Sequence, residues 1–484
     1  MVVMSGEEYL KSLTRLKPTI YVLGTRVENA FEHPMLRAAA DTVAVTYDLA
    51  KDPKYEGLMT ARSHVTGERI NRFTHVHQSV EDLVKKVKML RLLGRKTGTC
   101  FQRCTGLDGL NSLSIVTYEM DRELGTSYYD RFVDYVKRVQ ENDLSCALGM
   151  TDVKGNRKLR PSQQADPDLY LRVVEKDEEG IVVRGAKACI TGTAAAHEMI
   201  VMPTRAMREE DKGYAVSFAV PSDTEGVVQV VGRKPGDLRY LEKGVDIDLG
   251  NVGYAPQEAL VTLNDVFVPW ERVFMCGEHQ FAGRLVECFT AYHRQNYGGC
   301  KAGNSDVLIG ASALIAEYNG VATASHIRDK LVEMIHLTET MYGLGIACSS
   351  EGYETPSGTY IANPLLANVC KHNVTRFPYE ISRLAHDIAG GLVSTMPSEK
   401  DFRHEELGRP IDKYLRGVAD VPTEHRMRVL RLIENMTFGV GSVYLLESMH
   451  GAGSPQAQRI VMARAVDIEE LKELAKAVAG IRGS

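Results

Sequence analysis

The hydrophobic period of the chain changes twice, and this limits the folds available to it more than any other feature. In residues 6–145 apolar side chains recur at three- and four-residue spacing, which is typical of amphipathic helices. Residues 166–274 instead form short β-branched runs separated by Gly, Pro and Asp, which predicts strands. Helical spacing returns near residue 277 and continues to the end. The sequence therefore predicts a mostly α fold with a central β domain.

The predicted domains are an N-terminal helical domain (1–148), a middle β domain (149–277) and a C-terminal helical bundle (278–484). A chain of 484 residues with 44% hydrophobic side chains can bury a large core. Its net charge of −5 argues against a nucleic-acid-binding protein, because no basic excess is available to neutralise phosphates. The sequence contains no P-loop and no GxGxxG between a strand and a helix, so a Rossmann dinucleotide site is unsupported.

The N-terminal sequence MVVMSGEEYLKSL lacks the basic and apolar regions of a signal peptide. The apolar stretches fall well short of the roughly 20 residues that a membrane-spanning helix needs. We therefore expect a cytoplasmic protein. Thiols stay reduced in the cytoplasm, so the nine cysteines are not expected to form a disulfide framework.

Two distant segments together contain three thiols and one imidazole. Cys100 and Cys104 in CFQRC would share one face if that segment were helical, and HRQNYGGC contains His293 and Cys300. Each residue alone is more often a buried or hydrogen-bonded side chain, so the combination carries the argument. Three thiolates and one imidazole suit zinc or an iron–sulfur cluster, and spacing does not separate these. Gly298-Gly299 would admit another backbone or a bulky cofactor, or would loosen the helix.

Three further segments have the composition of flavin- or nucleotide-binding loops. The first lies where helices give way to strands, the second follows a predicted strand, and the third ends a predicted helix. Hydroxyls and free backbone amides beside glycine suit a flavin ring edge or a pyrophosphate, although the glycine-containing segments taken alone are more often a turn and a helix cap. The candidate cofactor-binding residues are Met150, Thr151 and Asp152; Thr191, Gly192 and Thr193; and Gly390 and Gly391.

Two carboxylates are candidate catalytic or positioning groups. Glu258 opens a predicted strand, and Glu447 lies on an apolar predicted helix. A carboxylate on an apolar face is costly to bury without a partner, and such residues concentrate at functional sites. For Glu447 a buried ion pair between helices is the structural alternative.

Segments along nearly the whole chain carry a family resemblance. The three-part order resembles the acyl-CoA dehydrogenase fold, with a middle β-barrel-like domain, and DPDLYLRVVEKDEEGIVVRGAKACITG resembles the flavin-dependent 4-hydroxyphenylacetate 3-hydroxylases within it. A narrower resemblance, to the 4-hydroxybutyryl-CoA dehydratase family, is carried by CFQRC, ENDLSCALGMTD, YHRQNYGGCK, EGYETPSGTY, RFPYEISRLAHDIAGG, TMPSE and ESMHGAGSPQAQRIVMAR. Residues 400–425 match least well, and Cys189 stands where a different polar residue is expected near the flavin.

The resemblance implies FAD and one 4Fe–4S cluster, with Cys100, Cys104 and Cys300 as thiolate ligands and His293 as the imidazole ligand. It implies a lyase that converts 4-hydroxybutyryl-CoA to crotonyl-CoA by radical dehydration. Isomerisation of vinylacetyl-CoA is the implied side activity. It also implies a homotetramer in which neighbouring subunits complete the flavin sites.

The expected reaction explains why both cofactors would be needed. The hydroxyl leaves C4 and the proton leaves C3, yet the thioester acidifies only C2. In our hypothesis a base removes the C2 proton, one electron passes to the flavin, C3 becomes acidic, hydroxide departs and the electron returns. His293 is the candidate base as well as a ligand, Tyr297 the acid for the departing hydroxide, and Glu258 and Glu447 position the substrate or His293. One nitrogen of His293 cannot hold iron and accept a proton together.

Three other functions stay open at this point. A flavin monooxygenase acting on a phenol would have the same fold but no use for the four ligands. An acyl-CoA dehydrogenase would need a catalytic carboxylate and no iron. A non-enzymatic helical assembly protein would simply bury its cysteines. A brown protein with iron, sulfide and flavin favours the dehydratase, a yellow one the flavoenzymes, and a colourless one the assembly protein.

Overall fold

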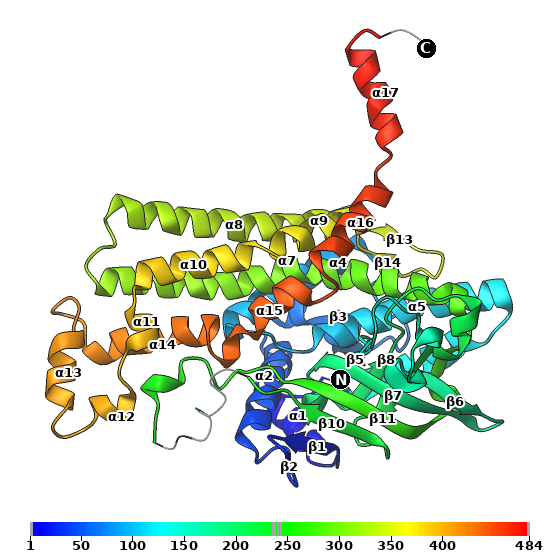
Figure 1. Cartoon of the computed structure of the whole chain (residues 1–484), viewed down its shortest axis with the longest axis horizontal. Coiled ribbons are helices and arrows are strands. Elements are labelled where there is room, and N and C mark those ends of the chain that lie inside the picture. Colours follow the sequence, from blue (N-terminus) through cyan, green and yellow to red (C-terminus); the bar gives the residue numbers. More distant parts are fainter. Residues whose placement is uncertain (1–2, 235–238, 240–241, 243, 482–484) are drawn as a thin grey trace.

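A computed structural model of the chain describes residues 3–234, 239, 242 and 244–481. Helices occupy both ends of the sequence and most strands lie between them, which confirms the predicted mostly helical fold with a central β region (Figure 1). The domain boundaries stay predictions. The described N-terminal helices are α1 (Gly6–Leu13), α2 (Pro34–Lys51), α3 (Glu56–Met59), α4 (Val80–Thr97), α5 (Cys104–Leu124) and α6 (Tyr128–Glu141).

Local sequence explains where α4 begins and ends. The Ser79 hydroxyl accepts a hydrogen bond from the backbone N–H of Asp82, as expected of the N-cap, and Gly98 ends the helix with a φ of 65°. Leu83, Val87 and Leu90 are buried along one face of α4. This face packs against α7 (His279–Tyr318), so α4 becomes one wall of the helical core.

The described strands of the β region form two sheets on one hydrophobic core. The six-stranded sheet has the order β2-β1-β10-β11-β7-β6 and the four-stranded sheet the order β12-β9-β8-β5, and no closed barrel is among the described pairings. The helical reading of residues 6–145 missed β1, which pairs in parallel with β10 in the larger sheet. The strands of this region are β1 (Thr19–Val22), β2 (Thr25–Arg26), β5 (Cys146–Gly149), β6 (Arg172–Lys176), β7 (Gly180–Thr191), β8 (Glu198–Val201), β9 (Val216–Pro221), β10 (Val227–Val231), β11 (Glu258–Pro269) and β12 (Val273–Cys276).

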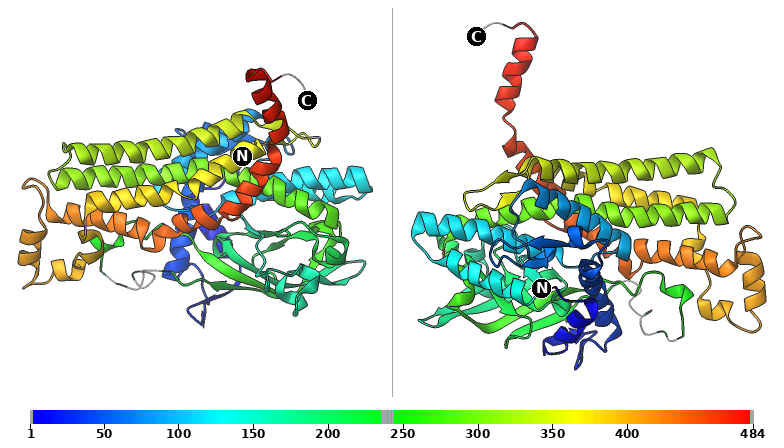
Figure 2. Two further views of the ribbon diagram at one scale, coloured as in Figure 1. Left: turned by 45° about the horizontal axis from the view of Figure 1, so that its top comes forward. Right: turned by 180° about the vertical axis from the view of Figure 1, so that it is seen from behind.

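Long helices of the C-terminal region lie side by side above the sheets, and α17 extends away from the body (Figures 1 and 2). Besides α7, the described helices of the C-terminal region are α8 (Ser325–Ser350), α9 (Pro364–Val374), α10 (Phe377–Ala389), α11 (Leu392–Thr395), α12 (Glu399–Phe402), α13 (Gly408–Leu415), α14 (Thr423–Thr437), α15 (Val443–His450), α16 (Pro455–Ala465) and α17 (Ile468–Val478). Two small hairpins complete the strands: β3 (Thr60–Arg62) with β4 (Arg69–Asn71), and β13 (Tyr353–Glu354) with β14 (Tyr360–Ile361).

Within the described ranges, no helix by itself combines the length and apolarity needed to cross a membrane. One bent pair, Thr423–Thr437 with Val440–Ala465, meets these two criteria only when its helices are taken together. The cytoplasmic location stays a prediction.

The Gly298-Gly299 pair allows three helices to approach one another closely. A Cβ on Gly298 would lie 2.6 Å from the Cα of Gly345 in α8, and one on Gly299 would overlap the carbonyl oxygen of Val87 in α4. Helix α7 continues unbroken through the pair. The pair therefore admits neighbouring backbones, which is one of the alternatives that the sequence left open.

Replacing Gly299 with alanine is expected to destabilise the protein by about 1–3 kcal/mol, because α4 must move away from α7 to make room for the methyl group. Gly310→Ala on the same helix is the matched control, since nothing lies within 4 Å of a Cβ there. That variant is expected to gain about 0.5–1 kcal/mol from helix propensity. Thermal unfolding of both variants measures the difference, and equal shifts would contradict the close-packing argument.

Candidate active site

The structure brings the two thiol-bearing segments into one buried region. Cys100 lies just before α5, Cys104 is the first residue of α5, and Cys300 lies within α7; none is more than 8% exposed. Burial raises the pKa of each thiol, and the negative charges of Asp108 and Cys300 raise that of Cys104 further. The three thiols are therefore close enough to affect one another electrostatically.

Residues 100–103 of the CFQRC segment are not helical, so Cys100 and Cys104 do not share a helix face. Gln102 has a left-handed φ of 66°, and its side chain donates to the carbonyl of Ala39 and accepts from the backbone N–H of Gln257. These contacts hold the segment as a loop at the entry to α5. The loop still places both sulfurs in the same buried region.

His293 and Tyr297 lie one turn apart on α7, as their spacing predicts. Their rings meet edge to face, and the Tyr297 hydroxyl is 3.4 Å from His293 Nε2. Burial raises the pKa of Tyr297 well above its usual value, and the charges of Glu447 and all three thiols add to this. The phenol therefore lies among the thiols, the imidazole and the carboxylate.

The other ring nitrogen of His293 meets a carboxylate that the sequence did not identify. His293 Nδ1 is 2.8 Å from the Oδ2 of Asp108, which lies on α5 one turn after Cys104. The Nζ of Lys86 in α4 is 2.5 Å from the other oxygen of Asp108. The four-residue spacing from Cys104 was a signal that could have found Asp108 in the sequence.

Glu447 forms the buried ion pair between helices that the sequence left open. Lys301 Nζ, beside Cys300 on α7, donates to Glu447 Oε2 at 2.6 Å. Burial raises the pKa of Glu447, but the charge and hydrogen bond of Lys301, with a hydrogen bond from Cys100, bring it below its usual value. Glu447 is therefore an ionised group beside Cys100, in the region of Cys100, Cys104 and Cys300 that is called here the thiol site. The sequence did not identify Lys301, although it follows Cys300 directly.

Glu258 lies in the same region, at the start of β11 in the larger sheet. Its carboxylate accepts from the Thr191 hydroxyl at 2.7 Å. Burial raises the pKa of Glu258 to about 8, and the negative charge of Glu447 contributes. The sequence analysis did not identify Lys234, which lies two residues after Gly232. The backbone N–H of Gly232 donates to the carbonyl of Glu258. Burial lowers the pKa of Lys234 to about 8.

The candidate flavin residues divide into three groups. Asp152 forms a buried ion pair with Lys187 at 2.8 Å. The carbonyl of Met150 accepts a hydrogen bond from Lys187 Nζ, and that of Thr151 accepts one from the backbone N–H of Ala188. The flavin role of this first segment stays a prediction. Thr191, Gly192 and Thr193 lie beside Glu258. Gly390 and Gly391 lie in an exposed turn between α10 and α11, toward the other end of the molecule from β7 (Figure 1).

The loop of residues 192–195 after β7, called here the Thr193 loop, and the neighbouring Gln257 contain buried polar groups that can meet a ligand. The Thr193 hydroxyl and Gln257 Nε2 are buried, and neither has a hydrogen-bond partner among the described residues. Gly192 has a φ of 77° and packs against the side chain of Gln102. Unsatisfied buried polar atoms are rare in folded proteins, so this loop fits the polar edge of a bound cofactor.

The donors are gathered but do not surround one point. Across the described parts of the chain, no three His, Cys, Asp or Glu side chains are placed to hold a single metal ion. Zinc needs four donors around one ion, whereas each iron of a 4Fe–4S cluster takes its own protein ligand. The three thiols and one imidazole would supply one donor for each iron of such a cluster.

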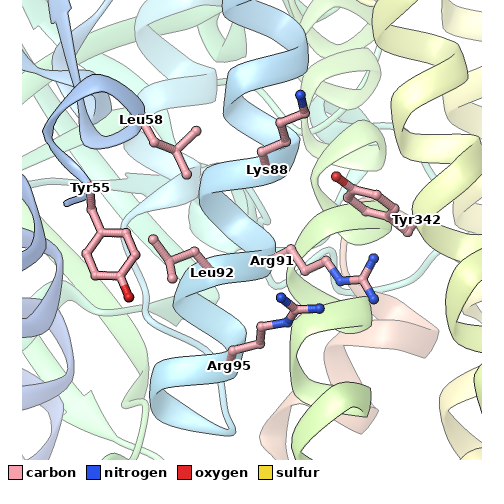
Figure 3. A pocket seen from close by; sticks show the side chains of 7 residues that line it. All are labelled: Tyr55, Leu58, Lys88, Arg91, Leu92, Arg95 and Tyr342. Atoms are coloured by element: carbon pink, nitrogen blue, oxygen red, sulfur yellow. The ribbon is translucent and has the colours of Figure 1, made fainter.

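A separate pocket of about 270 Å³ lies on another face of α4 (Figure 3). Lys88, Arg91 and Arg95 line it together with two tyrosines. The arginines are already paired with carboxylates, Arg91 with Asp306 and Glu339 and Arg95 with Asp306. The pocket is therefore largely neutralised and distinct from the thiol site.

Comparisons with known proteins cover the whole chain. Residues 5–275 and 282–480 match the N-terminal and C-terminal regions of the 4-hydroxyphenylacetate 3-hydroxylase family. A 4-hydroxybutyryl-CoA dehydratase/vinylacetyl-CoA-Δ-isomerase from Clostridium aminobutyricum is 55% identical over 490 residues, which cover 99% of this chain and 100% of the relative.

Solved structures give the same result. An oxygen-tolerant archaeal 4-hydroxybutyryl-CoA dehydratase from N. maritimus is 53% identical with a TM-score of 0.98, covering 100% of this chain and 96% of that one. The oxygenase component of 4-hydroxyphenylacetate 3-monooxygenase in complex with FAD is 25% identical with a TM-score of 0.84, and 98% of each chain is covered. Glutaryl-CoA dehydrogenase, at 13% identity and a TM-score of 0.50 over 85% of this chain and 82% of that one, shares the fold alone.

The structure predicts that Glu258 is mostly protonated at neutral pH. The infrared band of the Glu258 carboxylic acid is identified by its absence from Glu258→Gln. In the wild-type protein this band is expected to disappear as pH rises through about 8. Glu447→Gln removes a nearby negative charge, which favours ionised Glu258 and moves the transition to lower pH. Ionisation of Glu258 near the ordinary value of about 4.3 would contradict the arrangement.

Proposed function

Because this chain belongs to the 4-hydroxyphenylacetate 3-hydroxylase family and, within it, to the group of the 4-hydroxybutyryl-CoA dehydratases, we propose that it dehydrates 4-hydroxybutyryl-CoA to crotonyl-CoA and isomerises vinylacetyl-CoA. The observation that carries this proposal is the burial of Cys100, Cys104 and Cys300 beside the His293–Tyr297 pair. Hydroxylation of a phenol by a flavin has no use for such a set of donors.

The proposed cofactors are FAD and a 4Fe–4S cluster. The unpartnered Thr193 hydroxyl and the FAD-bound relative support the flavin, and the four gathered donors support the cluster. Burial, with the charge of Lys301, lowers the pKa of Lys371 well below its usual value, so an anionic group bound there would favour the charged form of Lys371. When bound, FAD would supply exchange of single electrons and the cluster a Lewis-acidic iron for the C4 hydroxyl.

His293 has only one nitrogen available for chemistry. An ionised carboxylate can only accept hydrogen bonds, so the contact with Asp108 requires that Nδ1 carries the hydrogen. Nε2, which faces the Tyr297 hydroxyl, is then the nitrogen without a hydrogen. His293 can accept the C2 proton only while Nε2 is not bound to iron.

Tyr297 is the proposed acid for the departing hydroxide. Its raised pKa keeps the phenol protonated at neutral pH, so a proton is available when the hydroxyl leaves. The Nζ of Lys371 lies 4.0 Å from the ring centroid and packs against the ring. Tyr297 thus stores a proton beside His293.

The two glutamates have different proposed tasks. Glu447, ionised and held by Lys301, fixes the polar wall beside Cys100. Glu258, mostly protonated at neutral pH, can donate a hydrogen bond to a substrate oxygen. Both positioning roles follow from the opposite shifts of their pKa values.

The proposed assembly is a homotetramer. Gly390 and Gly391 are exposed and lie apart from the Thr193 loop within one chain. As flavin contacts they would serve the site of a neighbouring copy, as the family resemblance implies. Sedimentation or mass photometry of the purified protein measures the oligomeric state.

Protein purified without oxygen is expected to be brown, to contain iron, acid-labile sulfide and flavin, and to form crotonyl-CoA from 4-hydroxybutyryl-CoA with no added oxidant. Cys300→Ala is expected to lower the iron content because it removes a ligand. Cys288→Ala, which alters another buried cysteine of α7, is the control and should retain iron. A yellow wild-type protein without iron, active on phenols with a reductase, would establish the monooxygenase instead.

Tyr297→Phe is expected to slow dehydration about 10²-fold or more, in the range for loss of a general acid. Isomerisation of vinylacetyl-CoA should fall less, because no hydroxide leaves in that reaction. Tyr292→Phe on the same helix removes a hydroxyl that donates to the carbonyl of Tyr360, and it should leave both rates nearly unchanged. Equal losses of the two activities in Tyr297→Phe would exclude the proposed acid role.

A further inference from the structure

One buried carboxylate connects the three helices of the site. Asp108 on α5 is fully buried and contacts Lys86 of α4 at 2.5 Å, His293 of α7 at 2.8 Å and Asn296 of α7 at 2.6 Å. Lys86 is also fully buried, and its Nζ lies 3.3 Å from Gln295 Oε1. A buried ion pair of this kind is costly unless its hydrogen bonds are satisfied, and here they are directed at His293.

The two carboxylate oxygens of Asp108 accept hydrogen bonds from different groups. Oδ1 accepts from the Lys86 ammonium, and Oδ2 accepts from both His293 and the amide of Asn296. Because the second oxygen is held by Asn296 as well, the His293 ring is fixed in orientation as well as in tautomer. Ligating histidines commonly donate their second nitrogen to a carboxylate in this way, and losing that partner typically costs 10–100-fold in metal affinity or activity.

We propose that Asp108, oriented by Lys86 and Asn296, is the positioning residue that keeps His293 Nδ1 protonated and directs Nε2 toward the three thiols. This inference rests on the proposed function, because it assigns Nε2 as the imidazole ligand of the cluster. Asp108 touches neither substrate nor cofactor and acts only through His293.

The network predicts a specific effect of Asp108→Asn. The amide has one oxygen, and the buried Lys86 ammonium draws it, since a charge-assisted bond is the stronger one. The NH₂ group then faces His293 and donates to Nδ1, so the hydrogen of the imidazole moves to Nε2. Asn296 permits this change because its Oδ1 has no hydrogen-bond partner among the described residues and can accept from the new amide after a flip. A protonated Nε2 cannot bind a metal.

The experiment uses the enzyme purified without oxygen and labelled with ¹⁵N-histidine. Electron–nuclear double resonance on the reduced protein detects the coupling of a nitrogen bound directly to iron. Wild type is expected to show the coupling, and Asp108→Asn to lose it together with 10–100-fold of the dehydration rate. Asp211→Asn is the matched control, because Asp211 is an equally buried carboxylate that bonds Arg160 and Ser162 instead. It should retain the coupling.

Two double variants separate positioning from a general loss of stability. In Lys86→Met/Asp108→Asn no ammonium draws the amide oxygen, which can turn to His293, and the coupling is expected to return. In Lys86→Met/Asp108→Leu the pair is replaced by apolar side chains, an exchange that often preserves stability, but no acceptor for Nδ1 remains. The coupling should be lost in this folded variant, which replaces Asp108→Asn if that single variant does not fold.

The outcomes distinguish this inference from the proposed function. A wild-type protein without iron, or without nitrogen coupling, overturns the proposed function and the inference with it. Normal coupling in wild type that persists in Asp108→Asn or in Lys86→Met/Asp108→Leu overturns only the positioning role of Asp108. Loss in Asp108→Asn with recovery in Lys86→Met/Asp108→Asn supports it.

Discussion

The site depends on the close approach of α4 to α7. A Cβ on Gly94 would lie 2.7 Å from the carbonyl oxygen of Cys300, and side chains at Gly299 and Gly303 would overlap the backbone of α4. Because these positions lack side chains, Lys86 of α4 can reach Asp108 and the backbone of α7. The same approach places Cys300 opposite the loop that carries Cys100. Helix–helix packing therefore sets the distance across which the donors face one another.

Buried charge gives the region its chemistry. Lys86 pairs with Asp108 and Lys301 pairs with Glu447, so each ammonium has a carboxylate within hydrogen-bond distance. Burial lowers the pKa of Lys371 and raises that of Glu258, so burial disfavours the charged form of both groups. Charges that are costly to bury are kept in natural proteins mainly where they serve a site. The concentration of such groups around Tyr297 is what distinguishes this region from an ordinary core.

The helical core and the β region contribute different residues to the site. The helical core holds the thiols and the His293–Asp108 pair, while the start of β11 contributes Glu258 and the end of β7 leads into the Thr193 loop. The substrate and electron-transfer roles that we propose would meet at this boundary. Neither half contains both sets of residues, which explains why the candidate segments are so widely spaced along the sequence.

The sequence by itself determined the helix–strand–helix order and the candidate donors, because periodicity and residue type are local properties. It did not decide whether CFQRC is helical, since the left-handed Gln102 is stabilised by contacts with Ala39 and Gln257, which are distant in sequence. It also missed β1, whose partner β10 lies some two hundred positions further on. Only the tertiary structure decided that Asp108 holds His293, that Lys301 pairs with Glu447, and that Asp152 is occupied by Lys187. Pairings between buried charges depend on distances across helices and sheets, and no local pattern in a chain records those distances.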